Sequence, residues 1–262
     1  MNLWSDLRAD AVLYEDGAAL VLNKPAGTAV MGERHGTDLV RLAEETGEQV
    51  FPVHRIDKNT SGAILFAKEL RHHGDLTRQF NRRTVDKVYL AVVCAADDAG
   101  PPPEVGVVDL PLSVGRKNRV RVAGNRADIG YDQTAGRWAL APGTAFDDVR
   151  SYPSQTRFVH VAGDPAHRLL AVAPLTGRRH QIRVHLAWIG QPIVGDPLFD
   201  KAAAANGTRT HLHAWRLGFD TADGDRVEVT APPDAEFWQP LPGGPPTGAD
   251  LHRAYQRLHE TG

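Results

Sequence analysis

The sequence of 262 residues lacks several features that mark whole classes of protein. Its one cysteine, Cys94, can form neither an intramolecular disulfide nor a metal site built from several cysteines. No apolar run approaches the roughly 20 residues that a membrane-spanning helix needs. The first ten residues show no signal-peptide pattern. We therefore expect a cytoplasmic protein with no membrane association, in which Cys94 is a buried small apolar residue.

Common catalytic motifs are missing as well. The phosphate-binding GxxxxGK[ST], the dinucleotide-binding GxGxxG after a first strand, the hydrolase GxSxG and the zinc-binding HExxH do not occur. His180 and His185 are five residues apart on an expected helix and therefore diverge. His211 and His213 face the same side of an expected strand, with no cysteine and no evident carboxylate partner. We expect no metal and no cofactor.

An excess of one charge is also lacking, because the formal net charge is -2 at pH 7. A sum near zero says nothing about how the two signs are distributed over the surface. Basic residues gather in the stretches 71–87, 116–121 and 178–183. Each stretch alone is most simply a solvated face. Together they allow a basic groove on a nearly neutral protein.

The apolar pattern predicts many strands and few helices. Strands outnumber helices and do not alternate with them regularly, which favours an α+β fold on a mixed or mainly antiparallel sheet. Residues 122–150, rich in Gly, Ala and Asp, are expected to form a surface insertion, and residues 242–262 a tail with a short helix. Strands are expected at 11–14, 19–23, 87–94, 169–173, 210–219 and 226–230; helices are expected at 37–47, at 69–83 and from a Thr176 cap to Gly190.

Two polar segments stand out from this pattern. The first, HRIDKNTSG at 54–62, feeds the apolar run AILFAK, and a loop of this kind is a common place for chemistry because the strand fixes what the loop presents. The second is PLTGRRHQIRVHLAWIGQPIVGDPLF at 174–199. Taken alone, Asp57 in the first segment is more simply a surface ion pair, and Tyr89 in an apolar strand a core residue.

The two segments resemble, in the same order, the HRLDxxTSG and PxTGRxHQIRxHL...GxPIxGDxxY motifs of the RluA-type RNA pseudouridine synthases. The second motif departs mainly at Arg179 and Phe199, where an aromatic is kept. The resemblance implies the pseudouridine synthase fold, with helices flanking a central sheet and a catalytic cleft, over residues 1–241 and without an N-terminal S4 domain. Weaker family features fall at Asn23–Gly27, Lys87–Ala91, Pro111–Leu112, Arg116–Lys117 and Leu212–Ala214.

The resemblance also implies the roles of four residues. Making pseudouridine breaks the bond from uracil N1 to the ribose, turns the base and joins C5 to the same ribose carbon. Asp57 is the implied catalytic carboxylate, which adds to the substrate or takes a ribose proton and must be ionised for either role. Arg183 is implied to pair with it and keep it ionised. Tyr89 is implied to line the uracil pocket, and Arg55 to lie near the extruded nucleotide.

The expected partner is ribosomal or transfer RNA, bound by a monomer. The target uridine must leave its stack, so uridines in structured loops are favoured. The candidate substrate-binding residues, besides Arg55, are Arg82, Arg83, Arg116, Lys117 and Arg178.

Two alternatives stay open. One is a noncatalytic RNA-binding protein with the same fold, against which the joint presence of Asp57, Tyr89 and Arg183 argues. The other is a glycosidase or nucleosidase, which would need a second positioned carboxylate. Asp196 is the nearest candidate, although in GDPLF it is interpreted as a turn residue.

Overall fold

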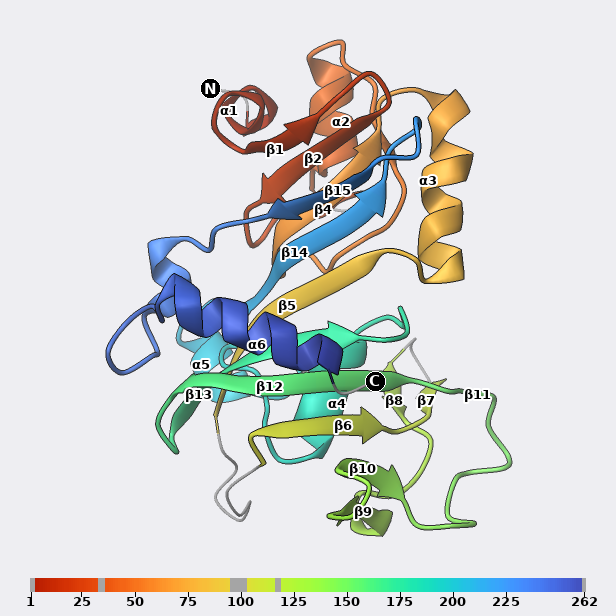
Figure 1. Cartoon of the computed structure of the whole chain (residues 1–262), viewed down its shortest axis with the longest axis vertical. Helices are drawn as coiled ribbons and strands as arrows, with labels where there is room; N and C mark the ends of the chain where they lie inside the picture. The colour runs from red at the N-terminus through yellow and green to blue at the C-terminus, as the bar shows by residue number, and fades with distance from the viewer. Residues whose placement is uncertain (1–2, 33–35, 95–102, 116–118, 261–262) are drawn as a thin grey trace. The chain divides into compact units, whose positions relative to one another are not determined.

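The structure, a computed structural model, describes residues 3–32, 36–94, 103–115 and 119–260. They form two compact units (Figure 1). Unit 1 is Met1–Tyr89 with Leu212–Asp234, and unit 2 is Leu90–His211 with Ala235–Gly262. Each contains a mixed sheet and its own helices, which confirms the α+β fold class. No helix within the described ranges is long and apolar enough to cross a membrane.

The sheet of unit 1 is formed by strands from both of its chain segments. The parallel pair is β4 with β14, and the other pairings are antiparallel. The order is β1 (Val12–Glu15), β2 (Ala19–Lys24), β4 (Ser61–Ala67) and β14 (Leu212–Asp220), with β15 (Arg226–Thr230) beside β14 and β3 (Phe51–Pro52) beside β4.

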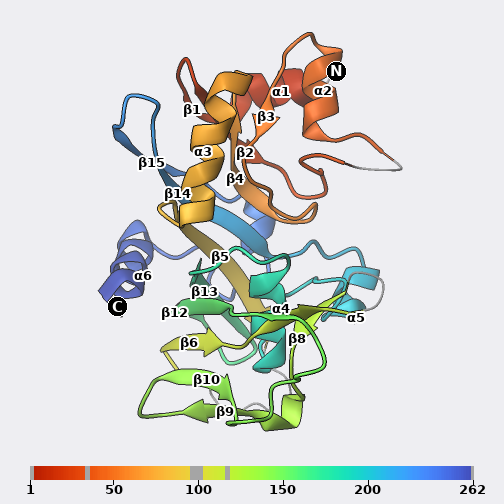
Figure 2. The same ribbon diagram turned by 90° about the vertical axis from the view of Figure 1, so that its right-hand side faces the viewer.

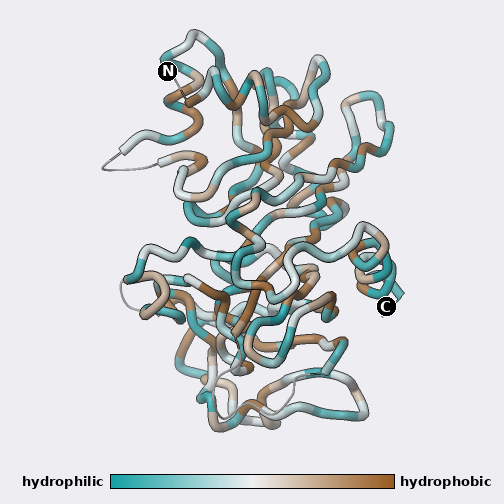
Figure 3. The backbone as a smooth tube through the Cα atoms, turned by 90° about the vertical axis from the view of Figure 1, so that its left-hand side faces the viewer, coloured by the Kyte–Doolittle hydropathy of each residue, from teal (hydrophilic) through white to brown (hydrophobic). Residues whose placement is uncertain are grey.

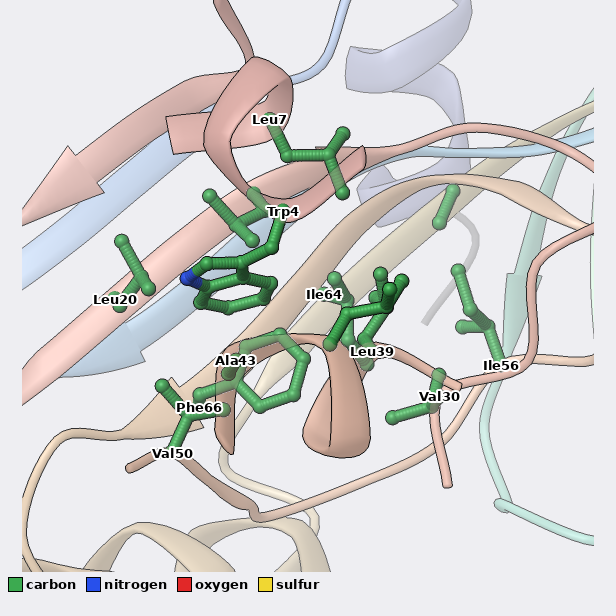
Figure 4. Close-up of a cluster of buried hydrophobic side chains, with 13 residues drawn as sticks. Trp4, Leu7, Leu20, Val30, Leu39, Ala43, Val50, Ile56, Ile64 and Phe66 are labelled. Carbon is green, nitrogen blue, oxygen red and sulfur yellow. The ribbon is translucent and has the colours of Figure 1, made fainter. Parts of the chain in front are cut away.

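Both faces of this sheet are covered, which explains why β2 and β4 are apolar at nearly every position. On one face, Leu20 and Phe66 pack with Trp4 of α1 (Leu3–Asp10) and with α2 (Leu39–Glu45) (Figure 4). On the other face, Val21 packs in a cluster with Leu76 of α3 (Leu70–Arg82). The two hydrophobic clusters therefore fix the central strands from both sides.

Unit 2 has a five-stranded path and a smaller sheet. Helices α4 (Gln181–Trp188) and α6 (Gly248–Glu260) pack on opposite faces of β12 and β13 (Figures 1 and 2). The path runs β13 (His167–Pro174), β12 (Gln155–Gly163), β6 (Val105–Asp109), β10 (Arg137–Leu140) and β9 (Ile129–Asp132), with β6 and β10 parallel; the smaller sheet is β11 (Ser151–Tyr152), β7 (Leu112–Val114) and β8 (Val120–Val122), and α5 is Lys201–Ala205.

Strand β5 (Asp86–Cys94) carries the chain from unit 1 into unit 2. Its last residue, Cys94, is only partly buried, so the prediction of a buried residue is not met in full. The thiol donates to the carbonyl of Pro192 at 3.5 Å. Burial and the negative charge of Asp200 raise the pKa of this thiol.

The predicted strands are confirmed, and α2 lies within the predicted helix 37–47. Asp38 caps α2, and its side chain accepts from the Arg41 N–H. Helix α1 was not predicted. Residues 122–150 include β9 and β10, which join the edge of the unit 2 sheet through β6. The C-terminal helix is α6, whose residues are largely hydrophilic in Figure 3 and which buries Ala254 and Leu258.

The predicted Thr176 cap is wrong, because α4 begins only at Gln181. His180 precedes the helix in a left-handed conformation, with φ of 55°. The Thr176 hydroxyl donates to the side chain of Gln181 at 2.6 Å. Thr176 therefore anchors the turn before the helix and does not cap the helix.

Strands β4 and β14 approach each other closely at Gly62, and a substitution there tests this contact. It has φ of 107°, and a Cβ there would lie 2.2 Å from the carbonyl oxygen of Ala214. We expect Gly62→Ala to lower the free energy of unfolding in urea by roughly 2 kcal/mol or more. The matched control is Gly74→Ala in α3, where nothing lies within 4 Å and the stability should rise by about 0.5–1 kcal/mol. Equal stabilities of the two variants would contradict this account.

Candidate active site

Asp57 lies in a loop between β3 and β4 that we call the Asp57 loop, residues 53–60. Asp57 is partly buried. The preceding side chain, Ile56, is 6% exposed and belongs to the hydrophobic cluster of Figure 4. After Asp57 the loop turns back, with the Thr60 N–H donating to the Asp57 carbonyl at 3.0 Å. Buried Ile56 on one side and the Thr60 hydrogen bond on the other therefore fix the backbone that presents this carboxylate.

A fully buried ammonium group ties the Asp57 loop to the preceding motif. Lys24, the last residue of β2, is 0% exposed. Its Nζ donates to the carbonyls of Pro25 at 2.9 Å, Thr28 at 2.7 Å and Lys58 at 3.1 Å. A buried charge is tolerated only when such partners replace water. The ammonium therefore joins residues 24–28 to the turn that follows the candidate carboxylate.

The end of the Asp57 loop is held by a buried serine–histidine pair. Ser61 opens β4, and its Oγ lies 2.8 Å from Nδ1 of His213. Nε2 of His213 lies 3.0 Å from the carbonyl of Ala231. A carbonyl only accepts, so Nε2 carries the proton and Nδ1 accepts from the serine hydroxyl. This contact joins the segment that contains Ser61 to the segment that contains His213, 152 positions later in the sequence.

His54 is a fixed acceptor in the same loop. Its ring stacks on Phe80, with centroids 4.3 Å apart, and its Nε2 accepts from the Leu65 N–H at 3.0 Å. Burial, together with the positive charge of Lys87, lowers the pKa of His54 to about 3. The ring is therefore neutral near pH 7 and supports the loop without exchanging protons.

Tyr89 comes from β5 and is the second candidate residue in unit 1. Its partly buried ring packs against the cluster that contains Ile56. Burial raises the pKa of the Tyr89 phenol, and the negative charge of Asp57 raises it further. The phenol is therefore protonated near pH 7, and the structure brings Tyr89 and Asp57 within electrostatic reach of each other.

Arg183, the third candidate, belongs to unit 2 and lies in α4. Its Nε donates to Oδ2 of Asp196, and its Nη2 donates to Oδ1, each at 2.7 Å. Arg183 is 7% exposed and Asp196 is 0% exposed. Asp196 Oδ1 also accepts from the Leu198 N–H at 2.9 Å, as expected of a turn residue. The turn interpretation was thus correct but missed the ion pair.

A sequence signal for this ion pair exists. Arg183 is the only basic residue other than histidine in the run QIRVHLAW, which is half apolar or more, and Asp196 is the only acidic residue between 174 and 199. A buried guanidinium needs a carboxylate or several carbonyls as partners. The pairing could therefore have been inferred without the structure.

The side-chain amide of Gln181 holds the turn before α4, a role that the sequence motif alone did not indicate. Oε1 of Gln181 accepts from the Thr176 hydroxyl at 2.6 Å and from the Arg178 N–H at 3.1 Å. Its Nε2 donates to the carbonyl of Gln155 at 2.8 Å and to Oγ1 of Thr156 at 3.0 Å. Gln181 therefore fixes the backbone of Arg178 and opens the helix that carries Arg183 two residues later.

The candidate RNA contacts of unit 1 are exposed. Arg55 lies in the Asp57 loop, and Arg82 is the last residue of α3. Arg83 caps that helix in a left-handed conformation, with φ of 61°. The structure places Arg82 and Arg83 together at one helix end, and Arg55 on a separate segment.

The candidate contacts of unit 2 are only partly described. Arg178 is exposed in the turn before α4, and its guanidinium carbon lies 5.0 Å from the ring centre of Tyr152. Arg116 and Lys117 lie outside the described residues. Within the described ranges, no group of three or more His, Cys, Asp or Glu side chains could hold a metal ion.

Comparison with known sequences gives a consistent family. The family described as RNA pseudouridylate synthase matches residues 18–188. The ribosomal large subunit pseudouridine synthase C of Vibrio cholerae serotype O1 is 36% identical over 248 residues, which cover 88% of this chain and 68% of that protein. The dual-specificity RNA pseudouridine synthase RluA of Vibrio vulnificus is 34% identical over 79% of this chain and 76% of that protein.

Solved structures agree on the fold. Human RNA pseudouridylate synthase domain containing 4 matches with a TM-score of 0.69 and 23% identity, over 97% of this chain and 95% of that chain. Human RNA pseudouridylate synthase domain containing 1 matches with a TM-score of 0.66, over 94% of each chain. The sequence motifs, the fold and these matches agree, and the chain belongs to the RNA pseudouridylate synthases, isomerases that convert uridine in RNA to pseudouridine.

Proposed function

We propose that this member of the family modifies selected uridines in structured ribosomal or transfer RNA, as a monomer in the cytoplasm, and that Asp57 is its catalytic carboxylate. The observation that carries the proposal is that buried Ile56, next to Asp57 in the chain, lies in the same hydrophobic cluster against which the Tyr89 ring packs. Ribosomal RNA is supported by the name of the Vibrio cholerae relative.

The chemistry assigns separate tasks to Asp57 and Tyr89. Isomerisation changes neither the oxidation level nor the composition of the uridine, so bond exchange at one ribose carbon suffices. Asp57 either adds to the substrate or removes a ribose proton, and the same fixed backbone serves both routes. The protonated Tyr89 presents a ring that can stack on uracil and a hydroxyl that can bond to it, which retains the base while it turns.

Arg183 is proposed to stabilise the ionised form of Asp57, and Asp196 to orient Arg183. A guanidinium has five N–H donors, of which the pair with Asp196 uses two. A bidentate carboxylate fixes the plane of the guanidinium and so the direction of its other donors. The glycosidase alternative loses support, because Asp196 is fully buried in this ion pair and unsuited to act as a second acid.

The role of Asp57 is tested by tritium release from RNA labelled at uracil C5 and purified from cells lacking this gene, since joining C5 to the ribose frees that hydrogen. We expect release by the wild type and none by Asp57→Asn. The control Asp75→Asn, at an exposed position of α3, should release tritium like the wild type. Release by Asp57→Asn would overturn the assignment, provided that circular dichroism shows both variants folded.

The ion pair makes a second prediction. Asp196→Asn leaves the buried Arg183 facing a neutral amide, so the free energy of unfolding should fall by roughly 3–5 kcal/mol. The control Asp220→Asn breaks the exposed pair with Arg226 and should cost less than about 1 kcal/mol. Urea denaturation measures both.

If Asp196 orients Arg183, Asp196→Asn should also lower kcat in the tritium assay at a temperature where the variant is folded, with a smaller effect on KM. Wild-type stability and kcat in Asp196→Asn would refute the positioning role.

A further inference from the structure

Two arginines share one tyrosine ring at the edge of the smaller sheet of unit 2. The guanidinium carbon of Arg150 lies 5.2 Å from the ring centre of Tyr152, and that of Arg178 lies 5.0 Å from it. Both arginines are exposed, and the tyrosine is partly buried. We call these three side chains the Tyr152 cluster.

The cluster is held by backbone contacts within unit 2. Tyr152 lies in β11 and pairs with Leu112 of β7, which is 2% exposed, so the tyrosine backbone is fixed at the sheet edge. Arg150 directly precedes β11, and its guanidinium reaches the Tyr152 ring from that side of the chain. Arg178 lies in the turn before α4, and its backbone N–H donates to Oε1 of Gln181. The two arginines thus converge from separate segments onto one ring.

The electrostatics of the Tyr152 cluster favour an anion. Two positive charges lie over the same ring, and no carboxylate of the described residues lies within 4.0 Å of either guanidinium. Each cation is attracted to the face of the ring, but this attraction does not neutralise its charge. A phosphate would supply the missing negative charge through planar, bidentate hydrogen bonds with these guanidinium groups.

We propose that the Tyr152 cluster is a binding site for the substrate RNA, at which a backbone phosphate lies between Arg150 and Arg178 and the neighbouring unpaired base stacks on a guanidinium plane. The inference rests on the proposed function, which supplies the RNA. Stacked guanidinium and aromatic planes are the surfaces on which proteins hold unstacked bases. Gln181 binds the backbone of Arg178 and is the first residue of α4, which carries Arg183. RNA bound at the Tyr152 cluster is therefore bound by the segment that also positions Arg183.

The test measures binding to ribosomal RNA purified from cells lacking this gene, by filter binding over a range of salt concentrations. The double variant Arg150→Gln/Arg178→Gln should bind about tenfold more weakly, and the slope of log K against log salt should fall by roughly one to two. The variant Tyr152→Leu should bind about fivefold more weakly with an unchanged slope, since it removes the ring and no charge.

The matched control is Arg253→Gln/Arg257→Gln on α6, which removes the same charge at exposed positions and should leave affinity and slope unchanged. Equal affinities of the double variant and this control would overturn the site. If the double variant does not fold, Arg150→Glu, at an exposed position outside regular structure, gives the same test.

The binding experiment and the tritium-release experiment can fail independently of each other. Tritium release by the wild type, with no binding defect in the cluster variants, overturns the Tyr152 cluster alone. A binding defect without tritium release by the wild type supports the cluster and overturns the proposed reaction.

Discussion

The buried ammonium of Lys24 is the interaction on which the Asp57 loop depends. It is a charge without access to water, and three carbonyls from two loops replace its hydration. Moving either loop would break bonds to a charged donor, which are stronger than those between neutral groups. At the other end of the loop, Ser61 is fixed by His213. The position of Asp57 thus follows from buried polar groups as much as from apolar packing.

Buried polar groups also fix the geometry of the candidate residues in unit 2. Arg183 is oriented by a fully buried carboxylate, and the turn before it by the amide of Gln181. His185, also buried, contacts Oγ1 of Thr156 and the carbonyl of Leu110, and burial lowers its pKa to about 4. These groups are costly to bury and satisfied only in one arrangement, so they favour a single geometry over a loosely packed core.

The sequence predicted those parts of the fold that have a strong local signal. Apolar runs predicted the strands and the apolar stripe predicted α2, because each depends on neighbouring residues only. Helix α1 was missed because its eight residues bury only Trp4 and Leu7, too few to show a helical period. The start of α4 was misplaced because the Thr176 hydroxyl bonds to Gln181, a tertiary contact that a capping rule does not include.

The candidate site shows the same limit. The family motifs indicated Asp57, Tyr89, Arg183 and Arg178 as residue types, but the contacts that position them were not visible in the motifs. Lys24 reaches the Asp57 loop across 34 positions of sequence. The Tyr152 cluster joins a family motif to a segment that has none. Such contacts depend on which strands are neighbours, which local sequence does not specify.

The condition of Cys94 has a practical consequence. It is the only thiol in the sequence, it is partly buried, and its pKa is raised, so little of it is thiolate at neutral pH. Because the thiolate is the form that reacts with maleimide dyes, labelling of Cys94 is slow under mild conditions. A second cysteine introduced at an exposed position can therefore carry a single fluorophore while the native thiol stays in place.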